Sequence, residues 1–339
     1  MWRQESAAWD SLHSSGDQTI DVSLIIGTRN RSQQLARFLE SVRRIKFERR
    51  WEFIIVDNGS VDKTAALVRD FIAAVSIPVA YVWEPRPGLG NAHNAGLKIA
   101  RGEILAFTDD DCYPAPDFLC RIWSGFEDVT VGYITGRIML HDSTDYLITI
   151  NESTTSLTIP ACSFIQPGAV QGANMAFRAS VLRDIDGFDP LFGPGSLFNS
   201  EDLDAAARAS ALGWRGEYRP EVVVSHHHGR KKSDIRPLLR SYYIGNGAYR
   251  MKLLLHHQRP FWSRPLYWKP RRRAVLWEVI GAAKYALAYL NETRRNRFGG
   301  RRSGIEPGIL SAKSSTVRSQ SHDLSRPPKL PSSGPSSMP

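Results

Sequence analysis

The sequence has few cysteines and no long apolar run, and both absences restrict what the chain can be. Its three cysteines, Cys112, Cys120 and Cys162, form an odd set without the paired spacing of a metal site. They support no disulfide framework, so we expect a reducing cytoplasm and three small buried side chains. The first 18 residues contain acids and no apolar core, so we expect no signal peptide. No stretch reaches the roughly 18 uncharged apolar residues of a spanning helix, which predicts a chain that is soluble or lies on a membrane surface.

The remaining composition is that of a globular protein with an uneven positive charge. The 339 residues are 42% hydrophobic, enough for the core of one large domain or one and a half. A formal net charge of +10 would suit nucleic acid, but much of the excess follows Lys269 and lacks stacking aromatics interleaved at regular spacing. We therefore expect no nucleic acid partner. Ser, Pro and Arg dominate 301–339 without periodicity, which predicts a disordered tail.

Strands alternate with helices in the first third of the chain. Buried strands are expected at 22–28, 53–56, 79–83 and 103–107, and helical periodicity follows each of the first three. This alternation predicts a parallel sheet with right-handed crossovers, as in nucleotide-binding α/β proteins. The later part reads as α+β, with strands expected at 132–140, 171–178 and 222–225, an irregular polar segment at 142–166 and a helix at 201–212.

Three consecutive carboxylates, Asp109, Asp110 and Asp111, follow the strand expected at 103–107. Adjacent like charges are costly unless a cation lies among them. The acids fall at the carboxyl edge of the sheet, where open α/β sheets bind ligands. Mg²⁺ and Mn²⁺ prefer such oxygen ligands and complete their shells with substrate phosphate, so the pattern predicts a metal–diphosphate site. The alternative is a turn whose acids cap the helix expected at 117–126.

Four further segments accompany these acids. Thr28 and Asn30 end the first strand, Asp57 ends the second, and Glu201-Asp202 begins a helix that continues through Asp204 and Arg208 to Gly213. The fourth is the glycine-rich segment 88–96, which contains Asn94 and Gly96. Alone, each reads equally well as a turn, a helix start or a packing site. Together, in this order, they resemble the inverting glycosyltransferases of family 2, over about residues 20–230.

The resemblance implies a role for particular residues. It implies a nucleotide-sugar site formed by Thr28, Asn30, Asp57, Asn94, Asp109 and Asp110. It implies that Asp109, Asp111 and His226 bind Mg²⁺ or Mn²⁺, and the sequence leaves open whether His228 reaches the metal instead. It implies that Asp202 is the general base, with Glu201 as a supporting acid. His93 stands where the family usually has arginine, which puts that phosphate contact in doubt.

We therefore expect an α/β protein of GT-A type: a Rossmann-like mixed sheet with helices on both faces, plus a C-terminal helical extension. The resemblance implies transfer of a sugar from a nucleotide-diphosphate sugar, with uridine diphosphate as the first choice, to a glycan or lipid-linked acceptor in polysaccharide or cell-envelope synthesis. The expected organisation is a loose N-terminus at 1–20, a catalytic domain at 21–230 divided into 21–112 and 113–230, a basic helical extension at 231–300 and a disordered tail at 301–339.

The basic extension contains an apolar helix, expected at 274–290, between arginines at 271–273 and 294–297. This pattern is typical of a helix that lies on anionic lipid, so we expect a peripheral membrane contact through 271–297 on the cytoplasmic side. The alternative is a helix packed on the catalytic domain or on another copy of it.

Two other functions are compatible with parts of the pattern. Gly27-Thr28-Arg29 suggests a sugar-nucleotide pyrophosphorylase, but Arg29-Asn30-Arg31 follows in place of the glycine-rich loop that such an enzyme needs. A non-catalytic carbohydrate- or nucleotide-binding protein of the same fold is the other alternative.

Overall fold

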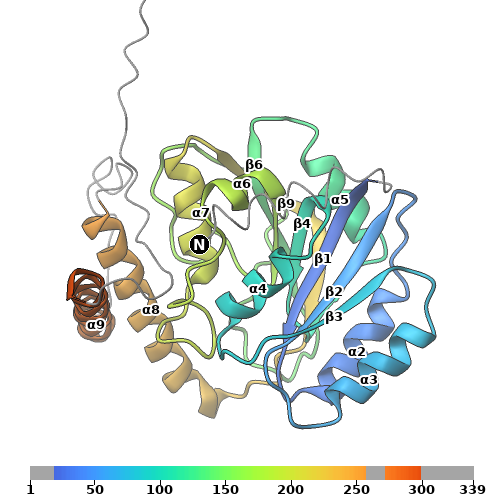
Figure 1. Cartoon of the computed structure of the whole chain (residues 1–339), viewed down its shortest axis with the longest axis horizontal. Coiled ribbons are helices and arrows are strands. Elements are labelled where there is room, and N and C mark those ends of the chain that lie inside the picture. The colour runs from blue at the N-terminus through green and yellow to red at the C-terminus, as the bar shows by residue number, and fades with distance from the viewer. Residues whose placement is uncertain (1–18, 257–271, 299–339) are drawn as a thin grey trace, which may run out of the picture. The chain divides into compact units, whose positions relative to one another are not determined.

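The computed structural model describes residues 19–256 and 272–298. Their centre is a mixed sheet of order β3-β2-β1-β4-β8-β6-β9-β5, with β7 paired to β9 (Figure 1). The predicted tail at 301–339, residues 1–18 and Arg271 lie outside the described residues. The strands are β1 (Ile20–Thr28), β2 (Trp51–Asp57), β3 (Val79–Trp83), β4 (Gly102–Thr108), β5 (Cys112–Pro114), β6 (Val131–Leu140), β7 (Leu157–Ile159), β8 (Asn174–Arg178) and β9 (Arg215–His226).

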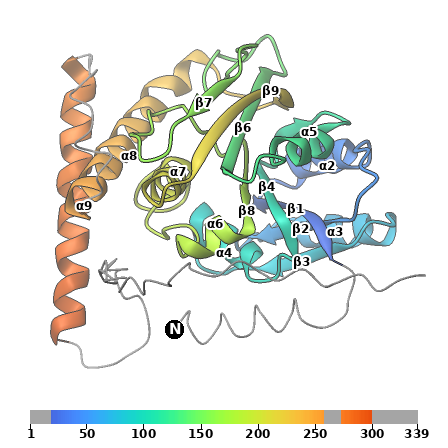
Figure 2. The ribbon, with the colours of Figure 1, turned by 90° about the horizontal axis from the view of Figure 1, so that it is seen from above.

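Helices cover both faces of the sheet, as Figure 2 shows. Apolar residues of α2, α3 and α5 form one core with one face, and those of α4, α6 and α7 form a second core with the other. Two longer helices, α8 and α9, pack beyond α7. The helices are α2 (Ser32–Val42), α3 (Thr64–Ala73), α4 (Leu89–Leu97), α5 (Phe118–Gly125), α6 (Ala179–Asp184), α7 (Glu201–Ala211), the 3₁₀ helix η1 (Lys232–Asp234), α8 (Ile235–Leu255) and α9 (Arg272–Phe298).

The strand pairing aligns most strand ends at one edge. β1, β2, β3 and β4 are mutually parallel, and β6 and β9 are parallel to each other. β8 lies antiparallel between β4 and β6, so all six of these strands run the same way. Their carboxyl ends therefore share an edge, as expected for a sheet that binds ligand there. The predicted fold class is confirmed.

Two expectations about local structure are wrong. β9 begins at Arg215, well before the predicted residue 222. The sequence did not indicate this start, because the first half of β9 alternates buried and partly buried side chains and has no continuous apolar run. The charged side chains of that half pair with each other, as Arg219 does with Glu217 at 2.9 Å. Only Cys112 is buried, whereas Cys120 and Cys162 are exposed.

A buried ion network joins α7 to α8. Asp204, 1% exposed, accepts from Lys252 Nζ at 2.6 Å and from Arg208 Nε at 2.8 Å, and Lys252 also contacts Asp189 at 2.6 Å. Burial opposes ionisation of Asp204, but the charges of Arg208 and Lys252 prevail and lower its pKa. Asp204, which the sequence analysis noted in the helix that begins at Glu201, thus joins α7 to Lys252 of α8.

We expect Asp204→Asn to lower the free energy of unfolding by about 3 kcal/mol, because the change leaves Arg208 without its carboxylate and Lys252 with only Asp189. Urea unfolding followed by circular dichroism measures the loss. The matched control is Asp117→Asn, since Asp117 pairs with Arg121 at an exposed surface and should contribute about 1 kcal/mol or less. Equal losses in the two variants would show that the buried ion network contributes no more to the free energy of unfolding than an exposed ion pair.

Candidate active site

The three acids lie between β4 and β5, at the edge where the parallel strands end. A turn closes them, because the Cys112 N–H donates to the Asp109 carbonyl at 3.0 Å. β5 then pairs antiparallel with the end of β9, with Cys112 opposite His226. This register places His226 Nε2 3.4 Å from Asp111 Oδ1, although the two residues are far apart in the sequence.

The resulting cluster has the composition of a divalent metal site. One ligand atom from each of Asp109, Asp111, Cys112 and His226 lies within 4.8 Å of the others. The structure thus brings together all three residues predicted to bind the metal. Cys112 is a weaker candidate, because burial and the nearby carboxylates raise the pKa of its thiol and favour the protonated form.

The electrostatics of the cluster favour a bound cation. Burial and the negative charge of Asp111 raise the pKa of Asp109. The pKa of Asp111 is lowered, because the hydrogen bond and charge of His226, together with Arg31, outweigh its burial. The two neighbouring carboxylates therefore cannot both ionise easily, and a divalent ion between them would favour the charged form of both.

Arg31 is a site residue that the sequence analysis did not identify. Its guanidinium contacts Asp110 at 3.1 Å and also Asp111. Asp110 accepts a second bond from the Thr28 hydroxyl at 2.7 Å, and burial raises its pKa to about 7 although Arg31 opposes the shift. The side chain of Arg31 is 38% exposed, so part of this cation faces the open edge. The sequence shows an arginine in the loop after the first strand, but the family resemblance implied no role for it.

The predicted nucleotide-binding residues of the first two strands lie side by side. Thr28 and Asp57 are register partners on β1 and β2. Asn30, in the left-handed region with φ 53°, links the following loops, since its N–H donates to Ser60 Oγ and its Oδ1 accepts from the Val61 N–H. Asp57 accepts from the Tyr81 hydroxyl and from the Ser60 N–H, both at 2.7 Å. These bonds fix the edge of the sheet beside the acids.

Asn94 and His93 on α4 are held by the protein interior. The Asn94 amide donates to the Phe188 carbonyl at 2.6 Å and accepts from the Phe188 N–H at 2.8 Å. His93 is 1% exposed, its ring lies 4.9 Å from that of Phe107, and burial lowers its pKa to about 3. A neutral buried histidine does not supply the positive charge that the family usually places there. The nucleotide contact of Asn94 stays a prediction, with its amide already engaged by Phe188.

Glu201 and Asp202, at the start of α7, differ in accessibility and in acidity. Asp202 is partly exposed and accepts from the Gly172 N–H at 2.9 Å and the Leu203 N–H at 2.7 Å. Burial raises its pKa to about 6. Glu201 is only 5% exposed, and burial together with the charge of Asp202 raises its pKa well above the usual range. The charge of Asp109 raises the pKa of both, so α7 begins within electrostatic reach of the acid cluster.

The neighbouring histidines have other partners. His228 Nδ1 accepts from the Arg230 N–H at 3.0 Å, and His228 does not belong to the cluster around Asp111. His227 shares a second group of candidate ligands with Asp142 and Asp145. There Lys231 Nζ already contacts Asp145 at 2.7 Å, so a protein cation pairs with one of the two carboxylates. Of the three histidines, His226 is therefore the one placed to bind a metal beside Asp111.

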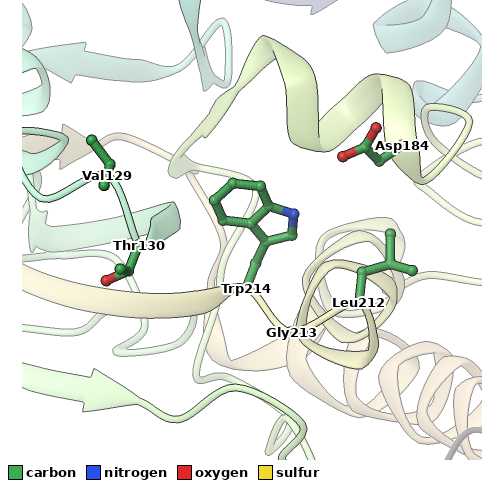
Figure 3. A pocket seen from close by; sticks show the side chains of 6 residues that line it. All are labelled: Val129, Thr130, Asp184, Leu212, Gly213 and Trp214. Atoms are coloured by element: carbon green, nitrogen blue, oxygen red, sulfur yellow. The ribbon is translucent and has the colours of Figure 1, made fainter. Parts of the chain in front are cut away.

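A surface pocket of about 660 Å³ lies at the opposite edge of the sheet (Figure 3). Val129 and Thr130 precede β6, and Trp214 precedes β9, so the pocket is at the amino ends of these strands. In Figure 3 the Trp214 indole lies between Val129 and the side chains of Asp184 and Leu212. None of the predicted site residues lines this pocket.

Comparison with known proteins agrees with this arrangement. The family model "Glycosyl transferase family 2" matches residues 23–186. The pre-mycofactocin glycosyltransferase of Mycobacterium tuberculosis is 27% identical over 243 residues, which are 69% of this chain and 48% of that protein. The chain thus spans about half the length of this relative. The glycosyltransferase AglE of Haloferax volcanii is 24% identical over 235 residues, 69% of this chain and 74% of AglE.

Solved structures share the fold. The mannosyltransferase PcManGT from Pyrobaculum calidifontis, in complex with GDP-Man and Mn²⁺, superposes with a TM-score of 0.58 at 20% identity and covers 87% of each chain. Residues 1–349 of S. aureus TarS, in complex with UDP-GlcNAc, superpose with a TM-score of 0.54 at 17% identity, over 82% of this chain and 75% of that one. At such identities the likeness shows the fold alone.

Within the described ranges, no helix combines the length and apolar character needed to cross a bilayer. The family match and the shared fold confirm the predicted resemblance. Residues 23–186 of this chain match glycosyltransferase family 2, and the described residues have a fold of GT-A type.

Proposed function

We propose that this enzyme transfers a single sugar, with inversion, from a nucleotide-diphosphate sugar to a hydroxyl of a glycan or lipid-linked acceptor. One observation carries the proposal: a cluster of metal-ligating side chains, Asp109, Asp111 and His226, lies within electrostatic reach of a partly exposed carboxylate, Asp202, whose pKa is raised to about 6. Diphosphate departure needs positive charge, and attack by a hydroxyl needs a base. The site offers a candidate for each.

Asp109, Asp111 and His226 would hold Mg²⁺ or Mn²⁺, which their oxygen and nitrogen ligands suit. When bound, the ion supplies charge neutralisation for the departing diphosphate. Arg31 would also help to neutralise the diphosphate. Its guanidinium contacts both Asp110 and Asp111, and its donors match the geometry of phosphate oxygens. Thr28, Asn30 and Asp57 stand at the adjoining strand ends, where the base and ribose of the donor would lie.

Asp202 would accept the proton of the attacking hydroxyl. A carboxylate with a pKa near the working pH is a stronger base than an ordinary aspartate and is still ionised at neutral pH. Glu201 is buried beside it and favours its protonated form, so it positions or tunes Asp202 and does not compete for the proton. In this proposal no side chain acts as a nucleophile. The acceptor hydroxyl attacks directly, opposite the leaving diphosphate, and so inverts the anomeric centre.

The identity of the donor and acceptor is the finer part of the proposal. PcManGT was solved with GDP-Man and TarS with UDP-GlcNAc, so the fold accommodates both bases. We take a UDP-sugar as the first donor to test. The loops at 142–166 and 193–199 would choose the acceptor, because loops on a rigid sheet carry specificity. Lipid-linked acceptors would place the enzyme at the cytoplasmic face of a membrane.

A panel of UDP- and GDP-sugars, incubated with the enzyme in Mn²⁺ and again with chelator, tests the proposal. We expect release of nucleotide diphosphate from one or a few donors, faster with a hydroxyl acceptor and abolished by chelator. The configuration of the new bond, read by NMR coupling constants, tests inversion. Retention of configuration, or turnover unaffected by chelator, would contradict the proposed mechanism.

The raised pKa of Asp202 predicts a pH limb. Because the ionised form must take the proton, kcat/KM for transfer should fall about tenfold per pH unit below about pH 6 and stay level above it. A bound divalent ion would shift this inflection to lower pH, since positive charge favours the carboxylate. Asp202→Asn should lack the limb. The assignment fails if the limb persists unchanged in Asp202→Asn.

A further inference from the structure

α9 packs closely against α8 at two glycines. A Cβ on Gly281 of α9 would lie 2.0 Å from the Ile244 carbonyl, and one on Gly247 of α8 would lie 1.9 Å from the Glu278 carbonyl. Tyr285 completes this inward face, 3% exposed, with its ring 5.8 Å from that of Phe192. These contacts place the inward face of α9 directly against α8 and Phe192.

The opposite face of α9 is apolar and exposed. Leu276 and Val279 are each 58% exposed, Leu287 is 62% exposed and Leu290 is 50% exposed. Together with the exposed Ala283, they recur every three or four residues and so form one stripe along the helix. Other exposed apolar residues are spread over many elements of the described chain. Figures 1 and 2 both show α9 at the outside of the molecule, beyond α8.

We propose that this outward stripe of α9, formed by Leu276, Val279, Ala283, Leu287 and Leu290, docks the enzyme onto an anionic lipid surface. An interfacial helix inserts an apolar face into the headgroup region and adds the attraction of basic residues to anionic lipid. In the sequence of α9, Arg272 and Arg273 stand at its start and Arg294, Arg295 and Arg297 near its end. Glu278 lies on the inward face, 3.6 Å from Arg250, so it does not oppose the attraction.

A second copy of α9 is a poorer occupant for two reasons. Both ends of the helix are rich in arginine, so a second copy laid in either direction would set like charges against each other. The stripe, from Leu276 to Leu290, is about 21 Å long and one helix wide, about 200 Å² in projection. Stable interfaces bury about 800 Å² per partner. Anionic lipid avoids both problems. Its negative charge attracts the arginines at both ends of α9, and insertion of a narrow stripe into lipid does not require a large protein interface.

Flotation of the full chain with vesicles tests the proposal. We expect binding to phosphatidylglycerol–phosphatidylcholine vesicles, weaker binding to phosphatidylcholine alone, and a decrease as salt rises. Leu276→Gln with Leu287→Gln should weaken binding about a hundredfold, about tenfold for each leucine removed from the apolar boundary. Both side chains are exposed, so folding and donor turnover without vesicles should be unchanged. Donor turnover by the wild type without vesicles tests the catalytic proposal separately.

The matched control carries Val129→Gln with Leu212→Gln, two exposed apolar residues at the pocket of Figure 3. It should bind vesicles like the wild type. The proposal is overturned if the wild type does not bind anionic vesicles, if the α9 variant binds as well as the wild type, or if only the control loses binding. It is also overturned if light scattering finds a dimer that the α9 variant dissociates, since the stripe would then serve a second copy.

Discussion

Asp202→Asn is expected to cut the turnover number for sugar transfer by about a hundred- to ten-thousand-fold, the contribution of a positioned general base. The asparagine keeps the size of the side chain and one oxygen for the N–H of Leu203 or Gly172, so the start of α7 should be preserved. The residues proposed to bind the donor lie on other elements. The dissociation constant for nucleotide diphosphate should therefore stay near that of the wild type, which calorimetry measures.

Glu201→Gln is the matched control for this prediction. Because Glu201 is buried and its pKa is raised well above normal, glutamine resembles the protonated form that the site favours, and the loss should be much smaller. The comparison must use transfer to an acceptor hydroxyl, since hydrolysis by water can depend on the base differently. If Asp202→Asn transfers normally while Glu201→Gln does not, then Glu201 and not Asp202 accepts the proton of the hydroxyl. Normal transfer by both variants would contradict the proposed catalytic role of Asp202 and Glu201.

The parts of the fold that the sequence predicted well are those with local causes. The strands that end at Thr28, Asp57 and Thr108 are continuous apolar runs because both faces of a parallel sheet are covered. Each run ends abruptly in polar residues, so the sequence alone predicts that Asp109 and Asp111 lie at the carboxyl edge of the sheet. The start of α7 at Glu201 was predictable for the same reason, from acids that precede an alanine-rich helix.

Other features of the site depend on long-range pairing, and His226 was expected at the metal only from the family resemblance. His226 reaches Asp111 only because β5 pairs with β9 in the register that sets Cys112 opposite His226, and no local pattern encodes that register. Arg31 was missed because an arginine after a strand is ordinary, and its value comes from the carboxylates that another strand brings to it. His93 was marked as a departure from the family, but its enclosure by Phe107 and Phe188 needed the packing of α4.

Asp111→Ala is expected to abolish the dependence of nucleotide-diphosphate binding on a divalent ion. In the wild type, chelator should weaken binding of UDP strongly, because the proposed ion would neutralise both the protein carboxylates and the phosphates. Outer partners of metal ligands contribute about ten- to a hundredfold in metal affinity, so removing a ligand itself should weaken Mn²⁺-dependent binding by more than about a hundredfold. Calorimetric titration with Mn²⁺ and with chelator measures both values.

The second acid group supplies the control for Asp111→Ala. Asp142 also lies beside a histidine, His227, at 3.9 Å, but its neighbour Asp145 is paired with Lys231, and this group lies outside the cluster of Asp109 and Asp111. Asp142→Ala should therefore bind UDP and Mn²⁺ as the wild type does. Alanine at 111 also releases Arg31 from one carboxylate, which leaves its guanidinium freer to bind phosphate directly. Residual UDP binding that no longer responds to chelator is thus the expected signature, whereas unchanged Mn²⁺-dependent affinity in Asp111→Ala would mean that the metal is held elsewhere.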